Sequence, residues 1–359
     1  MFARVVILIV GLAAAQAAFA EPYFAVQTGL KCMNCHSNPT GGGIRNAFGR
    51  TWSQTVLPSH PIDLDQQSLS GEISRYLSIG TNLRVDGTYL DVPHQPTQNN
   101  FDIEEARLYL ELTAIPDRLS IYFDQRIAPG GSNNLEAYVR YWSANHLWYV
   151  KAGQMYLPYG WRLEDDTAFV REVPGINMFT PDRGVEVGLE LGPWDAQFAV
   201  SNGTAGAPEN DRGKQYSALA QFVQPIWRVG VSANFNDADA GTRRLGGIFA
   251  GVRTGPIAWL GEADYVADKS FPDGERKQQV GLLEANWLMR KGHNLKLTAE
   301  YFDPDDSVDE DERARYSIVY EHTPIQFVQL RLGARVYDGI PQNDLDNRRF
   351  AFLQVNGYF

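Results

Sequence analysis

The stretch Glu105-Ala106-Arg107-Leu108-Tyr109-Leu110-Glu111-Leu112 places an aliphatic side chain at every second position. In an extended chain successive side chains point to opposite faces, so the four aliphatic residues share one face and the charged residues share the other. The same alternation returns near the end of the chain, where Leu330, Leu332, Ala334 and Val336 alternate with Gln329, Arg331, Gly333 and Arg335. Both stretches predict β-strands with one apolar face and one charged face.

The length and the sense of this alternation indicate what surrounds the sheet. A water-soluble sandwich hides its apolar faces and tends to use strands of about five or six residues. A strand that crosses a membrane at a tilt needs about ten residues, with lipid against its apolar face and water against its polar face. The alternating segments of this chain have the longer length, which favours a membrane-spanning barrel.

About sixteen such segments follow one another, and single-chain bacterial barrels have an even number of strands. We expect strands near residues 74–90, 101–115, 118–128, 134–143, 147–155, 184–191, 194–202, 215–224, 227–236, 243–254, 256–267, 276–290, 294–303, 312–323, 326–338 and 347–359. Short connections, such as Pro116-Asp117 and Gly192-Pro193, alternate with long ones, expected at 91–100, 156–183, 268–275 and 304–311. This asymmetry is typical of outer-membrane barrels, whose periplasmic turns are short. The sequence therefore predicts an all-β fold, a single transmembrane antiparallel β-barrel of about sixteen strands.

The first twenty residues indicate export. Arg4 precedes an apolar run from Val5 to Ala15, and Ala18-Phe19-Ala20 has the small residues of a cleavage site. We expect residues 1–20 to be a cleaved signal peptide and the protein to reach the bacterial outer membrane, with outer-membrane lipid as its surroundings. After residue 20, no apolar run is long enough for a membrane helix. The net charge of −11, with no basic face evident, argues against nucleic-acid binding.

Cys32-Met33-Asn34-Cys35-His36 is the sequence signature of covalent c-type haem attachment. Each thiol can form a thioether to a haem vinyl group, and the imidazole of His36 is then placed to bind the iron from one face. Half of a zinc site and a redox-active dithiol are the alternatives. A zinc site needs further ligands at matched spacing, and the chain has no other cysteine. A redox dithiol is expected near a βαβ pattern, which the sequence lacks.

The motif lies in a leading segment, residues 21–70, ahead of the predicted barrel at 71–359. A segment of this size buries too little apolar surface to be stable alone, so we expect it in or near the barrel lumen, held by haem. A short helix is expected over 44–56. Phe48 and Trp52, four residues apart on it, are candidates to pack on the porphyrin. Gly41-Gly42-Gly43 either turns closely around the porphyrin edge or is a flexible turn.

The second axial position of the iron has two candidate ligands. His60, in Ser59-His60-Pro61, is near the motif in sequence, and Met178 lies in the long connection after the fifth predicted strand. A vacant sixth position is the alternative. Ligation by two histidines usually gives a lower reduction potential than ligation by histidine and methionine, so this choice sets what the haem can oxidise.

A sixteen-stranded barrel is wide enough to leave an aqueous lumen. The connection from Tyr156 to Gly184 is the longest and is rich in aromatic residues. We expect it to fold inward, as the corresponding connection does in trimeric porins; an ordinary surface loop is the alternative. Acidic residues crowd 303–312, where they would raise the local concentration of cations, including ferrous iron; a solvated acidic loop is the alternative. Inward charges of both signs are expected to pair across strands.

A secreted segment with a single CxxCH motif, fused ahead of one barrel, resembles the family of fused monohaem cytochrome–porins of the outer membrane. The family's motif falls on Cys32, Cys35 and His36, and its downstream stretch resembles Asn46, Phe48, Gly49, Arg50 and Trp52. The resemblance of motifs covers about thirty residues, and the barrel is similar in architecture.

This resemblance implies electron transfer across the outer membrane through one haem c. An extracellular donor, with ferrous iron as one candidate, would pass electrons to a periplasmic cytochrome c, and an Fe(II):cytochrome c oxidoreductase activity is one form this takes. Two other functions stay open. The haem segment would be the plug, gate or sensor of a solute channel, or the barrel would dock a multihaem partner.

Overall fold

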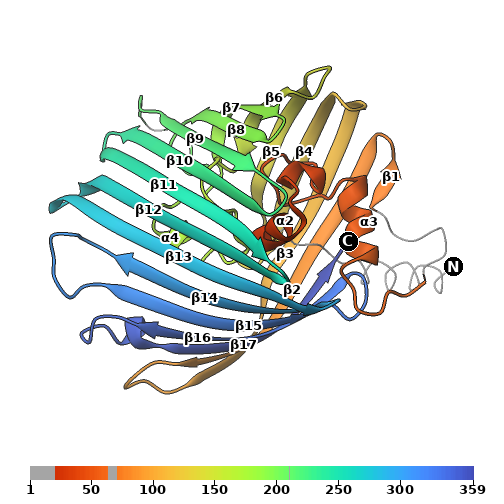
Figure 1. The fold of residues 1–359 in the computed structure, drawn as a ribbon. Coiled ribbons are helices and arrows are strands. Elements are labelled where there is room, and N and C mark those ends of the chain that lie inside the picture. Colours follow the sequence, from red (N-terminus) through yellow and green to blue (C-terminus); the bar gives the residue numbers. More distant parts are fainter. Residues whose placement is uncertain (1–20, 64–70, 210) are drawn as a thin grey trace.

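The structure is a computed structural model that describes residues 21–63, 71–209 and 211–359. The predicted signal peptide at 1–20 and the predicted segment boundary at residue 70 lie outside the described residues. From β2 to β17, each strand pairs antiparallel with the next along the chain, and β17 pairs with β2 (Figure 1). The described chain therefore forms a closed antiparallel barrel of sixteen strands, which confirms the predicted fold.

All of the predicted segments correspond in order to barrel strands. These strands are β2 (Leu77–Asp91), β3 (Gln98–Ile115), β4 (Leu119–Ala128), β5 (Asn133–Trp142), β6 (Trp148–Met155), β7 (Asp182–Leu191), β8 (Trp194–Ser201), β9 (Gln215–Val223), β10 (Trp227–Ala238), β11 (Gly241–Thr254), β12 (Ile257–Phe271), β13 (Gly274–Arg290), β14 (His293–Asp303), β15 (Arg313–His322), β16 (Val328–Asp338) and β17 (Arg349–Tyr358). A short additional strand, β1 (Glu72–Ser74), pairs with β2.

One predicted long connection is wrong. Residues 268–275 are not a loop, because β12 and β13 continue to Phe271 and from Gly274 and meet in a tight hairpin. The apolar alternation fades in Lys269, Ser270 and Glu275 although the strands continue. Where both faces of a strand meet water, its sequence no longer needs an apolar face, so the pattern cannot reveal the strand.

The barrel is inside-out compared with a water-soluble protein. On β16, Leu332 is 59% exposed while Arg331, beside it in sequence, is 6% exposed. The same holds on β3, where Leu108 is half exposed and Arg107 is buried. Arg107 donates from Nε to Asp124 on β4 over 2.9 Å. Apolar side chains thus face outward and paired charges face the lumen, as a lipid-spanning wall requires.

The leading segment lies inside one mouth of the barrel (Figure 1). It contains the helix α2 (Pro22–Thr28), the 3-10 turn η1 (Cys32–Asn34) and the helix α3 (Ala47–Thr55), which is shorter than the predicted 44–56. No helix among the described residues is long and apolar enough to cross a membrane.

Polar contacts attach this segment to the end of the barrel where the short turns lie. Lys31 Nζ lies 2.6 Å from Glu190 Oε2 on β7, and Arg228 on β10 donates to the carbonyl oxygens of Ala25 and Leu30 over 2.6 Å. Further contacts are made by Lys296 with Glu21 (2.6 Å), Tyr23 with Glu321 (2.9 Å), Arg253 with the Gln27 carbonyl (2.9 Å) and the Ser59 amide with the Thr323 carbonyl (2.9 Å).

The connection between β6 and β7 folds inward, as predicted. It contains the one-turn helix α4 (Phe169–Glu172), and its backbone reaches the far wall, where the Trp161 amide donates to Glu262 over 2.8 Å and the Phe169 amide donates to Glu300 over 2.7 Å. Asp165 pairs with Arg315 at 3.0 Å and with Arg335 at 2.7 Å. The lumen is therefore filled from one end by the leading segment and further along by this inward connection.

Candidate functional site

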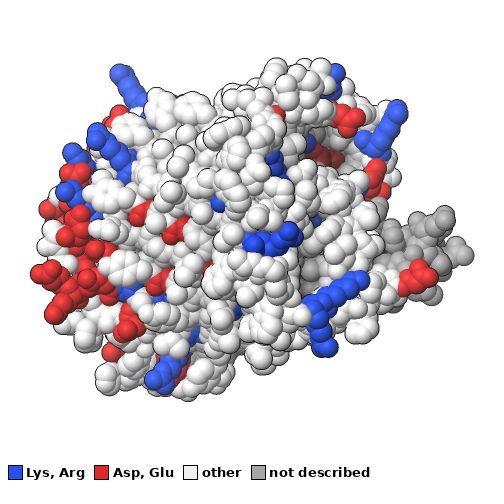
Figure 2. Space-filling model, viewed as in Figure 1, with Lys and Arg blue, Asp and Glu red and all other residues white. Residues whose placement is uncertain are grey.

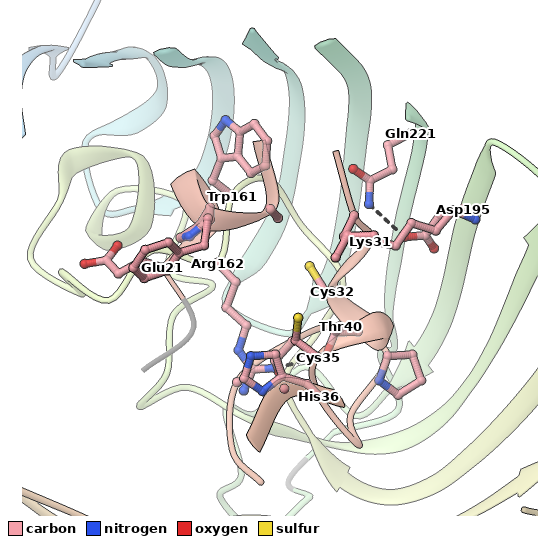
Figure 3. A pocket seen from close by; sticks show the side chains of 18 of the residues that line it. Glu21, Lys31, Cys32, Cys35, His36, Thr40, Trp161, Arg162, Asp195 and Gln221 are labelled. Carbon is pink, nitrogen blue, oxygen red and sulfur yellow. Dashed lines mark hydrogen bonds between the residues drawn. The ribbon is translucent and has the colours of Figure 1, made fainter. Parts of the chain in front are cut away.

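A cavity lies between the leading segment and the inward connection, inside the barrel, and its empty space together with the adjoining solvent is about 980 Å³. Cys32, Cys35 and His36 all line it. Figure 3 shows both sulfur atoms pointing into the same space, with Trp161 and Arg162 of the inward connection beside them. The motif therefore opens into a space that the leading segment, the inward connection and the barrel wall enclose together.

Local hydrogen bonds fold the motif so that its three functional side chains share one side. The amides of Cys35 and His36 both donate to the Cys32 carbonyl, over 3.1 and 3.0 Å, which closes a tight turn. Asn46 holds this turn to α3. Its Nδ2 donates to the carbonyls of Met33 and Asn34, over 2.9 and 3.0 Å, while its Oδ1 accepts from the Gly49 amide at the start of α3.

Asn46→Ala is expected to loosen the leading segment, because it removes the N-cap of α3 and both bonds to the motif turn. The cost should be about 2 kcal/mol, the sum of a lost cap and lost side-chain hydrogen bonds. Limited proteolysis of the folded barrel should show faster cleavage within residues 21–62. Asn46→Ser separates the two roles, since serine can cap the helix but is too short to reach the turn. Cleavage of both variants at the wild-type rate would contradict this role of Asn46.

The wall of the cavity is largely apolar and aromatic. Phe24 and Trp52 from the leading segment meet edge to face at 5.1 Å, and Trp161 meets Phe249 of β11 at the same distance. Trp52, predicted as a packing residue, lines the cavity. Phe48 does not line it and is 50% exposed. At 100° per residue, the buried face of α3 is centred between Gly49 and Ser53, and Phe48 is turned further from it than Trp52.

The electrostatic surroundings favour the neutral forms of the motif side chains. Burial, with the positive charges of Arg45 and Arg162, lowers the pKa of His36 to about 3. A neutral imidazole is the form that binds a metal. Burial raises the pKa of the Cys32 thiol to about 11 and also raises that of Cys35. A redox dithiol needs a lowered thiol pKa, so this environment disfavours that alternative.

The arrangement fits a covalently attached haem. The His36 ring is buried and lines the cavity, and its Nδ1 atom makes no hydrogen bond. Arg45 and Arg162 line the cavity and offer positive charge to the carboxylates of a porphyrin. These are our grounds for treating the cavity as the candidate haem site.

The glycine run is a tight left-handed turn rather than a flexible one. Gly41, Gly42 and Gly43 have φ values of +88°, +72° and +61°. A Cβ atom added at Gly43 would overlap the hydroxyl group of Tyr122 on the barrel wall. Gly41 and Gly42 line the cavity, so the turn brings backbone against its edge.

The two candidates for the second axial ligand lie elsewhere. His60 is exposed at the short-turn end, where its Nδ1 is 3.1 Å from Ser59 Oγ and its amide donates to the Pro324 carbonyl. Met178 lines a second cavity, and its Sδ is 3.6 Å from a guanidinium nitrogen of Arg107. The two cavities are neighbours, because Arg162 and four other residues line both of them.

Several residues of the site carried no signal in the sequence. Arg162 donates to Thr40 Oγ1 over 2.9 Å and to the Gly41 carbonyl, so it joins the inward connection to the motif segment. Asp195 and Gln221 on β8 and β9 also line the cavity and are hydrogen-bonded to each other over 2.7 Å (Figure 3). Polar and charged side chains are common along the lumen of a barrel, so the sequence could not show which of them line the cavity.

The acidic residues of 303–312 lie in the β14–β15 connection, at the end of the barrel opposite the leading segment. Figure 2 shows acidic side chains gathered at this end. Most of them are exposed. Within the described residues, no group of three or more histidine, cysteine, aspartate or glutamate side chains is arranged to hold a metal ion.

The closed sixteen-stranded barrel and its inward connection give this protein the fold of outer-membrane porins. Comparison with solved structures agrees. The anion-selective porin from Comamonas acidovorans superposes with a TM-score of 0.63 at 12% identity, covering 79% of this chain and 99% of that one. OmpT expressed in the outer membrane of Vibrio cholerae gives 0.60 at 10% identity, covering 79% and 97%. The outer-membrane channel DcaP of Acinetobacter baumannii gives 0.59 at 13% identity, covering 79% and 97%.

At these identities the likeness concerns the fold alone. No protein-family model matches the chain, and no curated protein matches it.

Proposed function

We propose that this protein is an electron conduit of the outer membrane, with one covalent haem c attached to Cys32, Cys35 and His36 inside a porin-fold barrel. One observation carries the proposal: the three motif side chains line a single cavity within the lumen, and that cavity is shaped by the leading segment and the inward connection together. If the haem segment lay outside the barrel, the inward connection would not form part of the wall around the motif.

The chain's own residues would divide the work of holding the group. Cys32 and Cys35 would form the thioethers, His36 would bind the iron, and Trp52 and Trp161 would pack against the porphyrin. When bound, haem c supplies a centre that gains and loses one electron. The surrounding lumen is filled with protein, and a largely dry site raises the reduction potential because it disfavours the extra charge of ferric iron.

A redox centre at this depth shortens the insulating distance across the membrane. The apolar band of such a barrel is about 25 Å tall, and a haem in the lumen would divide that gap. We propose that the short turns and the leading segment face the periplasm, where a cytochrome c would accept electrons. The acidic connections would face outward, where their charge would concentrate a cationic donor such as ferrous iron.

Stopped-flow spectroscopy tests iron as the donor. Ferrous iron is expected to reduce the haem of the purified protein, and His36→Ala should abolish that reduction because the iron loses its proximal ligand. The variant barrel should still assemble, which its heat-modified mobility on a gel would check. A haem that ferrous iron does not reduce at acidic or neutral pH would remove iron from the proposal and leave the conduit to another donor.

A second candidate function is a solute channel that the leading segment plugs or gates. The similarity of the fold to porins and to an outer-membrane channel favours it. Planar-bilayer conductance separates the two functions. Large steady currents through the haem-loaded protein would favour the channel, and near-silent bilayers would favour the conduit.

A further inference from the structure

A second side-chain ligand to a haem at this site would have to come from a residue that lines the cavity, and histidine and methionine are the usual ones. The chain holds six histidines and five methionines. All of them except Met1 are in the described part of the chain, so the position of each can be compared with the lining of the cavity.

Each of these side chains other than His36 lies away from the cavity. His60 is exposed at the short-turn end, and Met178 lines the second cavity. The others are placed as follows: His94 and His146 are exposed between strands, His293 and His322 stack on each other at 4.1 Å, Met155 is buried against Tyr138, Met289 is 48% exposed on the outer wall, and Met33 lines a separate groove beside Gly192. Of the described histidines and methionines, His36 alone lines the cavity.

The other ionic side chains that line the cavity close to the motif are engaged with protein partners. Lys31 Nζ is 2.6 Å from both Glu190 Oε2 and the Trp194 carbonyl oxygen, and Glu21 is 2.6 Å from Lys296. Moving Lys31 onto a metal would leave the buried carboxylate of Glu190 without this countercharge, and moving Glu21 would break its contact with Lys296.

One polar group of the lining does lack a partner. Gln221 is 6% exposed, and its amide donates to Asp195 over 2.7 Å while its Oε1 atom makes no hydrogen bond. Gln197 donates to the same carboxylate over 3.0 Å. This corner, formed by Asp195, Gln197 and Gln221, therefore presents a buried acceptor to whatever small molecule enters the cavity.

We infer that the iron of this site has one side-chain ligand, His36, and an exchangeable sixth position that takes water or a small diatomic molecule such as carbon monoxide or nitric oxide. The inference rests on the proposed covalent haem. It adds a ligand-binding activity to the electron transfer proposed above, because a haem with a proximal histidine and an open distal side binds exogenous ligands.

The experiment uses the full-length protein purified with its haem. The ferric form is expected to be high-spin by optical and electron paramagnetic resonance spectroscopy, and the ferrous form is expected to bind one carbon monoxide per haem with a full shift of its main absorption band. His60→Ala and Met178→Leu are the matched variants, and both should leave the ferric spectrum unchanged.

Two results would overturn the inference: a low-spin ferric spectrum with no response to carbon monoxide, or a change of spin state in either variant. If no haem stays attached to the protein on a denaturing gel, the proposed function is overturned instead. The gel and the spectra therefore distinguish the two failures.

Discussion

Replacing both Cys32 and Cys35 by alanine is expected to remove all covalently bound haem while leaving the barrel assembled. The thioethers can form only at these two sulfurs, since the chain has no other cysteine. The ring itself closes through the pairing of β17 with β2, to which the motif contributes no strand. Haem staining of a denaturing gel measures the first effect, and the heat-modified mobility of the barrel measures the second.

Met33→Ala is the matched control, because Met33 lies between the two cysteines and does not line the cavity. It should retain full haem staining. Haem that stays attached in the double alanine variant would show that the motif is not the attachment site, and loss of the barrel as well would show that the leading segment is needed for assembly.

Deleting residues 22–62 is expected to raise the single-channel conductance by about an order of magnitude or more. A barrel of this strand number leaves a water-filled channel when nothing occupies it, and this segment fills the short-turn end of the lumen. Glu190 and Arg228, which bind the segment, would face water after the deletion, so their charges would become solvated. The inward connection would remain and keep the pore narrower than the bare ring.

Planar-bilayer recordings of the deletion variant and the full chain measure this effect. Thr51→Ala is the control, since Thr51 is exposed on α3 and its loss should leave the conductance at the wild-type level. Equal conductance of the deletion variant and the full chain would show that the leading segment does not block the lumen. High conductance of the full chain would favour the solute-channel function.

The inward connection shows where sequence reasoning about the lumen reached its limit. The length and the aromatic content of 156–183, together with the inward fold of the corresponding connection in trimeric porins, predicted that it folds inward, and its bonds to Glu262 and Glu300 confirm this. The partners on the wall could not be predicted, because β12 and β14 are about one hundred or more residues away along the chain. Only the closing of the ring brings these strands opposite the connection.

The residues proposed to hold a haem show a different limit. Cys32, Cys35 and His36 follow from a local motif whose spacing matters, so the sequence is sufficient to predict them as a haem-attachment set. His60 and Met178 were chosen by nearness in sequence and by position in the expected constriction. The structure places both outside the cavity, because His60 is exposed at the short-turn end and Met178 lines the second cavity.

The sequence by itself determined the strand count, the outward direction of the apolar face and the presence of the attachment motif. These depend on local rules, namely the two-residue period of a strand, the contrast between lipid and water on its faces, and the spacing of two cysteines and a histidine. The tertiary structure alone decided which barrel residues hold α2 in the mouth of the barrel, that Asn46 and Arg162 hold the motif, and which side chains line its cavity. Those contacts join residues far apart in the chain, and the closure of the ring sets them.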